Sequence, residues 1–518
     1  MTLALRARLD ALASEEPLPL GDAFTLPDVS DADRLVLTFV RMGGESIPWG
    51  LAFGHPGESP TILTIPEPRD RDLVARLVTP LADALDAHLG HPRLGDVVDF
   101  AQRQLWLPGH AHVDMLHHLA LRFTNARRTD EDLVLTLNRL GRACGFLHRE
   151  ATREGQLAVV DAARLLAEHW TFPVEPARQT HLGFLLAWLR TRGPLDRRRH
   201  AAREAERVSV GTTLDPRLEN DELAPRVEEW NASKGKGRVH ARVEQQLHDR
   251  LEAELARRFA LVVDAVRLVD ADPRRANSEL GDLEEAARRS HEGDYLRVES
   301  ALVDEGVAFV PSPETDHHSA GAAARFFSHL AAAEDHAGSL VHGDASIFAR
   351  LQESGDAFEA RMIRLDDEGA GRGHDPVWIL ETSAHTPLRL RLGACVCPVG
   401  QRKRQGRIRE ITRDGDMRRI VVAITDGKTR RAIPDGLDAH DPRLIGQTLR
   451  LVAAGSGARS RNLTFAAWKS DGPGAWLTHA KPRPSATLSS TRAEDLVSLV
   501  ESLKGAPGTT GKRARKSR

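Results

Sequence analysis

The spacing of the apolar residues changes near residue 360, and this change requires two kinds of fold in one chain. Between residues 240 and 270 apolar residues recur every three or four positions, the period of an amphipathic helix; they are Val243, Leu247, Leu251, Leu255, Phe259, Val262, Val266 and Val269. Beyond residue 360 short apolar runs separated by turn residues predict strands. The predicted strands are Glu359–Leu365, Val377–Glu381, Leu388–Val399, Arg407–Thr412, Arg418–Thr425, Thr448–Ala453 and Leu463–Lys469, with a hairpin turn at Asp414-Gly415.

A chain of 518 residues exceeds the size of one hydrophobic core, so we predict a multidomain α+β protein. Residues 1–105 are expected to form a small N-terminal α+β domain, and residues 106–345 an all-helical scaffold. Residues 346–482 are predicted to form a small β-barrel, OB-like or SH3-like, with a basic surface. Residues 483–518 read as a linker, a short helix and a disordered basic tail.

Local patterns give further elements in the first 345 residues. Strands are predicted at 35–40, 49–53 and 61–65, and a helix from Leu73 to Leu89 is expected to cover them. Helices are also predicted after a capping box at Thr129–Asp132, at 157–169 and at 180–190. The helix over 240–270 is predicted to end before Pro273 and to pair with a second helix, roughly Asn277 to Val303, in a long helical hairpin.

The net charge of −2 is an average over two unlike regions. From residue 401 onward there are 25 Lys and Arg against 11 Asp and Glu, a net charge of +14. The first 400 residues hold 47 Lys and Arg against 63 Asp and Glu, a net charge of −16. An acidic body is therefore followed by a basic C-terminal region. Basic side chains on a β surface attract nucleic-acid phosphates through counterion release, without reading the sequence.

The basic residues of the predicted barrel are the candidate site. We predict contacts with DNA or RNA through twelve residues: Arg402, Lys403, Arg404, Arg407, Arg409, Arg418, Arg419, Lys428, Arg430, Arg431, Trp468 and Lys469. Exposed aromatic side chains can stack on bases in small barrels, and Phe465, Trp468 and Trp476 are the candidates. The alternative interpretation is a solvated charged face, or an arginine-rich sheet edge that discourages strand pairing.

One histidine-rich segment suggests a metal site. The run His110-Ala-His112-Val-Asp114-Met-Leu-His117-His118 resembles the HxHxDH metal motif of metallo-β-lactamase-like hydrolases. Met115 stands where that motif has a histidine, which favours a His-rich helical face. The three cysteines (Cys144, Cys395 and Cys397) are too few for a disulfide framework or an all-cysteine zinc site. We predict no metal and no cofactor.

A second segment suggests phosphoryl transfer. The run Ser339-Leu-Val-His342-Gly343-Asp344 resembles the His-Gly-Asp segment of the aminoglycoside-phosphotransferase-like kinases. The resemblance implies that Asp344 orients an acceptor hydroxyl. Ala349 occupies the position of the family's magnesium-binding asparagine, and no nucleotide-binding hairpin precedes the segment. An enzyme is therefore the less favoured interpretation.

These patterns predict a non-enzymatic scaffold or accessory subunit. Its basic β-domain contacts DNA or RNA, and its acidic helical body docks a protein partner such as a helicase or nuclease. No secretory signal pattern and no bilayer-length apolar stretch is seen, so we expect a cytoplasmic protein without membrane contact. Two alternatives stay open: a protein-binding adaptor that binds no nucleic acid, and a divergent phosphotransferase that uses His342, Gly343 and Asp344.

Overall fold

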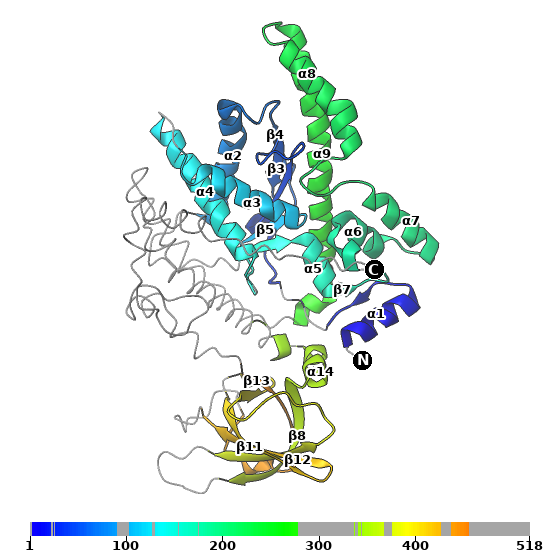
Figure 1. Cartoon of the computed structure of the whole chain (residues 1–518), viewed down its shortest axis with the longest axis vertical. Coiled ribbons are helices and arrows are strands. Elements are labelled where there is room, and N and C mark those ends of the chain that lie inside the picture. Colours follow the sequence, from blue (N-terminus) through cyan, green and yellow to red (C-terminus); the bar gives the residue numbers. More distant parts are fainter. Residues whose placement is uncertain are drawn as a thin grey trace, which may run out of the picture. The chain divides into compact units, whose positions relative to one another are not determined.

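The computed structural model shows a mixed α+β protein with a six-stranded antiparallel sheet in its C-terminal region (Figure 1). The residues that it describes are 3–21, 24, 26–90, 103–126, 130–153, 155–174, 176–277, 336, 340–342, 344–366, 376–402, 404–425 and 437–454. None of the helices in these ranges has the length and apolar character needed to cross a membrane.

Five strands form one mixed sheet in the order β4-β3-β2-β5-β6. Their bounds are β2 (Arg34–Val40), β3 (Gly50–Gly54), β4 (Thr61–Thr64), β5 (Gln104–Leu107) and β6 (Val159–Asp161). β2, β5 and β6 are parallel, whereas β3 runs antiparallel to both of its neighbours. The strands predicted at 35–40, 49–53 and 61–65 are confirmed as β2, β3 and β4.

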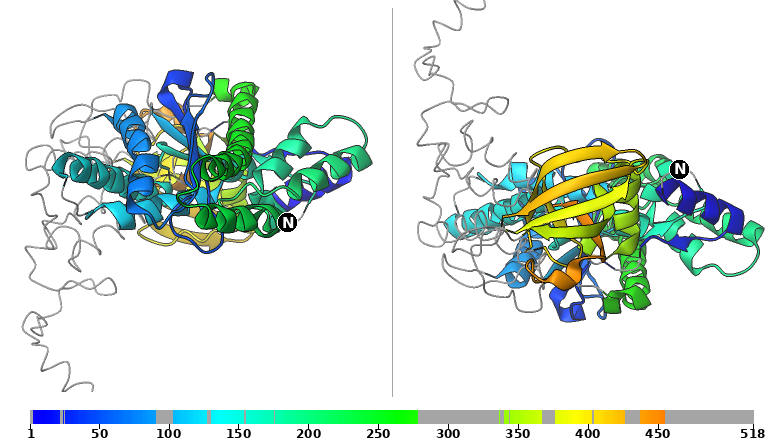
Figure 2. Two further views of the ribbon diagram at one scale, coloured as in Figure 1. Left: turned by 90° about the horizontal axis from the view of Figure 1, so that it is seen from above. Right: turned by 90° about the horizontal axis from the view of Figure 1, so that it is seen from below.

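Both faces of the sheet are covered, which explains the continuous apolar run of β2. All seven residues of β2 are buried. Leu35, Leu37 and Phe39 pack in a cluster with α2 (Arg71–Leu89), α3 (His110–Phe123) and α4 (Glu131–Ala151). Val36 and Val40 point to the opposite face and join a cluster with α9 (Arg238–Asp270). The view from above shows helices on both sides of the sheet (Figure 2, left).

The helix predicted from the 240–270 pattern is confirmed as α9. All eight apolar positions of the predicted stripe are buried, and Gly50 of β3 lets Leu255 approach the sheet closely. The helix ends at Asp270, before the short 3₁₀ turn Pro273–Asn277. The second arm of the predicted hairpin lies beyond Asn277, outside the described residues.

The predicted helices at 73–89 and 180–190 are confirmed as α2 and α6. The segment predicted as a helix at 157–169 is β6 followed by α5. The cap of α4 is Asp130, whose carboxylate accepts from Leu133 N, and Thr129 of the predicted capping box lies outside the described residues. The other elements of this region are α1 (Leu3–Ser14), β1 (Leu18–Pro19), α5 (Ala162–His169), β7 (Trp170–Thr171), α6 (Leu182–Arg190), α7 (Leu195–Glu206), a π-helical turn (Leu218–Leu223) and α8 (Ala224–Ala232).

Six antiparallel strands form the C-terminal barrel in the order β10-β11-β12-β9-β8-β13. They are β8 (Ala357–Asp366), β9 (Val377–Ser383), β10 (Cys395–Pro398), β11 (Gly406–Asp414), β12 (Met417–Ile424) and β13 (Thr448–Ala453). β10 is shorter than the predicted run 388–399, and it joins β11 through two residue pairs and β13 through three. The Asp414-Gly415 turn is confirmed, with Gly415 at φ 59°. The strand predicted at 463–469 lies outside the described residues.

The barrel core lies inside this ring. Ile408, Ile420 and Val422 of the β11–β12 hairpin point inward, where Trp378 is fully buried. A smaller cluster lies outside the ring, where Phe348 of α14 (Ala345–Ser354) covers Cys397.

The five-stranded sheet crosses the predicted domain boundary at residue 105. Its strands β2, β3 and β4 precede this residue, whereas β6 follows α4. A three-residue strand in a parallel sheet has no periodic signal, so the region from residue 106 appears wholly helical in the sequence.

Candidate functional site

The structure describes half of the predicted nucleic-acid-binding residues. Arg402, Arg404, Arg407, Arg409, Arg418 and Arg419 belong to the barrel. The other six predicted residues lie outside the described residues: Lys403, Lys428, Arg430, Arg431, Trp468 and Lys469.

Two of the six arginines support the barrel itself. Arg404 is 6% exposed, and its Nε donates to Leu437 O at 2.9 Å. Arg418 is half-buried, and its two Nη atoms donate to Ala384 O at 3.0 Å and Thr386 O at 2.8 Å. Both guanidinium groups satisfy carbonyl oxygens of loops. Arg402 is half-buried as well.

The remaining three, called here the hairpin arginines, are Arg407, Arg409 and Arg419 of β11 and β12, and all are exposed. Arg409 is the extra residue of a β-bulge, because Ile408 pairs with Val422 and Glu410 pairs with Val421. Among the described residues, no carboxylate lies within 4.0 Å of the hairpin arginines. Arg407 Nη1 donates to Gly393 O at 3.1 Å, which occupies one of its donors. The other donors of the three guanidinium groups are available to an anion.

The surface around the hairpin arginines is mixed in charge. Glu410 is exposed beside Arg409, and Glu381 of β9 is the cross-strand neighbour of Arg419. Beyond residue 400 the described residues hold nine Arg against five Asp and Glu, a net charge of +4. The rest of the +14 lies outside the described residues.

The described barrel offers no aromatic platform for base stacking. Its aromatic side chains are Phe348, Phe358 and Trp378, and all three are buried. Trp378 Nε1 donates to Ala439 O at 3.0 Å, so this indole belongs to the core. Phe465, Trp468 and Trp476 lie outside the described residues. Contacts made by the described residues would therefore go to phosphates.

The His110–His118 segment is the first part of α3, and its side chains are dispersed. His112 is fully buried, whereas His110 and Asp114 are exposed and 3.6 Å apart. The His117 ring stacks on that of His148 at 4.7 Å. Within the described part of the chain, no three His, Cys, Asp or Glu side chains are arranged to hold a metal ion.

His112 has a structural role beside β2, where it joins this strand to the segment around Val210. His112 Nδ1 accepts from Phe39 N at 3.1 Å, and its Nε2 lies 3.0 Å from Val210 O. Burial lowers the pKa of His112 to about 3, so the imidazole is neutral and Nε2 carries the proton.

A buried arginine holds the same segment from the other side. Arg258 is 0% exposed, and it donates from Nε to Gly211 O at 3.0 Å and from Nη2 to Thr213 O at 3.2 Å. Its Nη1 lies 2.6 Å from Glu254 Oε2, which compensates the buried charge. The segment 210–213 is therefore fixed at the end of β2, where Arg41 N donates to Thr212 O at 2.7 Å.

The His342-Gly343-Asp344 segment leads into α14. Asp344 is 6% exposed and directly precedes the helix. His342 accepts from Gly400 N at its Nδ1, 2.9 Å away, and its Nε2 lies 3.9 Å from Cys397 Sγ. Gly343 lies outside the described residues. A buried carboxylate beside a helix start cannot meet an acceptor hydroxyl without rearrangement.

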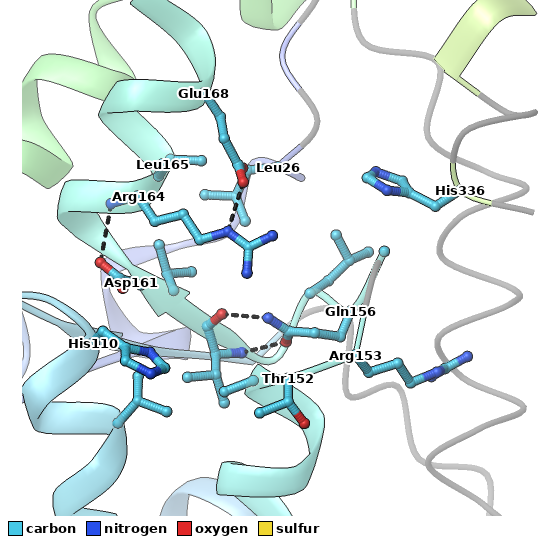
Figure 3. Close-up of a pocket in the computed structure, with 16 residues that line it drawn as sticks. Leu26, His110, Thr152, Arg153, Gln156, Asp161, Arg164, Leu165, Glu168 and His336 are labelled. Carbon is cyan, nitrogen blue, oxygen red and sulfur yellow. Dashed lines mark hydrogen bonds and ion pairs between the residues drawn. The ribbon is translucent and has the colours of Figure 1, made fainter. Parts of the chain in front are cut away.

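A cavity of about 220 Å³ lies beside β6 and the start of α5 (Figure 3). Several of its polar groups bond to one another. Arg164 Nε donates to Glu168 at 2.6 Å, and Asp161 Oδ1 accepts from Arg164 N at 3.0 Å as the cap of α5. The side-chain amide of Gln156 donates to Val159 O and accepts from Val159 N. These two hydrogen bonds satisfy the backbone at the free edge of β6. Burial raises the pKa of Asp161, although the hydrogen bond from Arg164 N opposes this. The arrangement caps α5 and stabilises the edge of β6.

Comparisons of this chain with protein families, curated proteins and solved structures find no match. The interpretation therefore rests on the geometry described above.

Proposed function

We propose that this chain is a non-enzymatic scaffold or accessory protein that contacts DNA or RNA through the barrel and docks a protein partner through its acidic helical body. Residues 1–277 of the described chain, which carry the five-stranded sheet and its helices, are called the α/β body below. The observation that supports this proposal is the exposure of the hairpin arginines without an ion-pair partner in the described residues. Three guanidinium groups on one hairpin provide forked donors that match phosphate oxygens. We further propose that the ring of six strands is a small OB-like or SH3-like barrel, a class that often binds ligands on a strand face.

The proposed contact is with the phosphate backbone. Arg409 lies at the bulge and keeps the outward alternation of β11, in which Ile408 is buried, so its side chain can reach a neighbouring phosphate. Because the described barrel has its aromatic side chains in the core, base stacking would have to come from other residues. We therefore expect weak sequence preference and strong salt dependence. A cytoplasmic location is part of the proposal, and the three unpaired cysteines agree with it.

The test is a binding titration with a fluorescently labelled 30-base-pair DNA duplex over a range of salt concentrations. Replacement of Arg407, Arg409 and Arg419 by Gln should reduce the slope of log K against log salt by about 2 to 3, since each lost duplex phosphate contact contributes about 0.9. A single-stranded DNA and an RNA of equal length identify the preferred form.

A matched control removes the same charge from the same barrel. Arg364, Arg443 and Arg450 are exposed, and each is paired with an acid: Asp366, Asp441 and Glu359. The Gln variant of these three should bind as the wild type does. Equal binding by all three proteins would contradict the role of the hairpin arginines. No binding at low salt would instead favour the protein-binding adaptor.

A further inference from the structure

The helix α7 is unusually basic for its place in the acidic part of the chain. Of its twelve residues, the one fully buried side chain is Ala202, and Leu195 packs partly buried against the same core cluster. The helix contains Arg197, Arg198, Arg199 and Arg203. Charge averaged over the first 400 residues conceals this helix, although the run of three consecutive arginines is visible in the sequence.

These arginines divide into one that is paired and several that are available. Arg198 is 13% exposed and binds Glu16 at 2.8 Å, which attaches α7 to the N-terminal segment. Arg197, Arg199 and Arg203 are exposed, as is Arg192 just before the helix. Within the described ranges no carboxylate lies within 4.0 Å of these four side chains, called here the α7 arginines.

The acidic residues of α7 do not neutralise this surface. Glu204 is bound to Arg207 at 2.8 Å, and Glu206 lies 3.7 Å from Arg178. Asp196 is the remaining acid of the helix. Arg199 and Arg203 are four residues apart, so they share one face, where like charges at this spacing destabilise a helix. Like charges that destabilise a helix, and that no carboxylate of the described residues neutralises, are expected where a bound anion neutralises them.

The composition of the exposed face indicates the kind of ligand. A protein interface needs an apolar or aromatic core, and the exposed face of α7 consists of Asp196, Arg197, Arg199, His200, Arg203 and Glu204. Guanidinium groups one helical turn apart lie about 6 Å from each other along the axis, which is close to two phosphate steps of a duplex strand. A polyanion with regularly spaced charges fits this face better than a protein does.

We propose that the α7 arginines form a second phosphate-binding surface of this chain, which binds the backbone of duplex nucleic acid. The proposal shares its ligand class with the proposed function but does not depend on the hairpin arginines. In this arrangement Arg199 and Arg203 contact phosphates of one strand, and Arg197 lies on the other flank of the exposed side of the helix.

The experiment uses the full chain and the labelled 30-base-pair duplex. Replacement of Arg197, Arg199 and Arg203 by Gln should reduce the salt slope by about 2 to 3 and weaken binding at low salt by about tenfold or more. The control replaces Arg69, Arg242 and Arg250, which are exposed but paired with Glu45, Glu229 and Glu222. This control variant also loses three positive charges from the same region of the chain, and its salt slope should equal that of the wild type. Glutamine is a good helix former, so thermal unfolding of the α7 variant should match that of the wild type.

The outcomes separate this inference from the proposed function. A normal slope in the α7 variant, with a reduced slope in the hairpin variant, would overturn the inference and leave the barrel site in place. A reduced slope in the α7 variant, with a normal slope in the hairpin variant, would support the α7 surface and reject the barrel site. Loss of binding to a polyglutamate of equal length, with duplex binding intact, would assign α7 to acidic proteins and also overturn the inference. Absence of any duplex binding at low salt would reject both.

Discussion

Arg34 and Asp270 form a bidentate ion pair, in which each Nη atom of Arg34 lies 2.8 Å from a different carboxylate oxygen of Asp270. Arg34 is the first residue of β2 and Asp270 the last residue of α9, so the pair fixes the long helix to the central strand. The Arg34 side chain is 3% exposed. Four further charged residues extend the pair into a network: Asp28, Asp31, Arg267 and Arg275.

Removal of the Arg34 side chain should therefore destabilise the α/β body strongly. Arg34→Ala leaves Asp270 with Arg275 as its remaining partner and opens a buried polar site. We expect a loss of about 3 kcal/mol in the free energy of unfolding, because the buried bidentate pair between β2 and α9 is broken and Asp270 keeps only Arg275. Urea denaturation followed by circular dichroism measures it. As a control, Arg6→Ala removes an exposed pair with Asp10 at 4.0 Å and should change stability by less than about 0.5 kcal/mol. Equal effects of the two variants would contradict the structural role of Arg34.

Two glycines of α4 provide a second test, of the close packing between α3 and α4. A Cβ atom at Gly141 would lie 2.2 Å from Thr124 N and 2.6 Å from Phe123 C, both of which are backbone atoms. Gly141→Ala should separate the two helices and cost about 3 kcal/mol or more. At Gly145 the nearest atoms are side-chain atoms of Ala120 and Arg149 at 3.5 and 3.6 Å. Gly145→Ala should stabilise the protein by up to about 1 kcal/mol, since alanine is the better helix former. Thermal unfolding compares the two, and similar midpoints would refute the close approach.

The elements with strong periodic patterns were predictable, and those set by distant pairing were not. The stripe of α9 and the run of β2 carry enough apolar residues to specify their own type. β5 and β6 have four and three residues, and their strand conformation depends on parallel pairing, of β5 with β2 and of β6 with β5. Nothing in the local sequence distinguishes Val159-Val160 from the start of a helix. The extent of the sheet beyond residue 105 could therefore not be predicted.

The same distinction applies to the candidate site. Composition predicts that arginines gather near residues 402–419, but it cannot tell which of them support loops. Arg404 is buried because Leu437, 33 residues away, presents its carbonyl to the guanidinium group. Arg409, in contrast, is exposed in the regular alternation of β11, in which Ile408 is buried. Only the burial of Arg404 depends on a contact with a distant segment, which the sequence does not encode locally.

His112 should make the stability of the α/β body sensitive to acid. Its pKa is about 3 in the folded protein and 6.5 when exposed, so protons bind preferentially to the unfolded state. The stability that it provides is complete above pH 6.5 and is lost as the pH falls from there toward 3, at about 1.4 kcal/mol per pH unit. His112→Gln removes this slope. It should cost about 2 kcal/mol at pH 7.5, since Phe39 N and Val210 O lose their partner, and the two stability curves should meet near pH 5.

A non-titrating substitution on the same helix is the control for His112. Val113 is 2% exposed, and Val113→Ala should lower stability by about 2 kcal/mol at every pH without altering the slope. His88 and His169, whose pKa values burial lowers to about 4, continue to titrate in all three proteins. If His112→Gln keeps the wild-type slope between pH 6.5 and 4, the imidazole is not held neutral in the folded state.

The three cysteines should differ sharply in reactivity, because thiolate is the reactive form and two of the thiols are buried. Burial raises the pKa of Cys144 to about 12 and that of Cys397 to about 11. Cys395 and Cys397 are alternate residues of β10, so both lie on the outer face of the barrel, while Val396 between them packs inside. Val341 and Phe348 cover Cys397, and Cys395 is half-buried.

We expect an aromatic disulfide reagent at pH 8 to label one thiol per native chain rapidly and all three thiols in urea. Peptide mapping should identify the rapidly labelled thiol as that of Cys395. Cys395→Ser should leave almost no rapid labelling. Rapid labelling of two thiols in the native protein would show that α14 does not stay packed over β10.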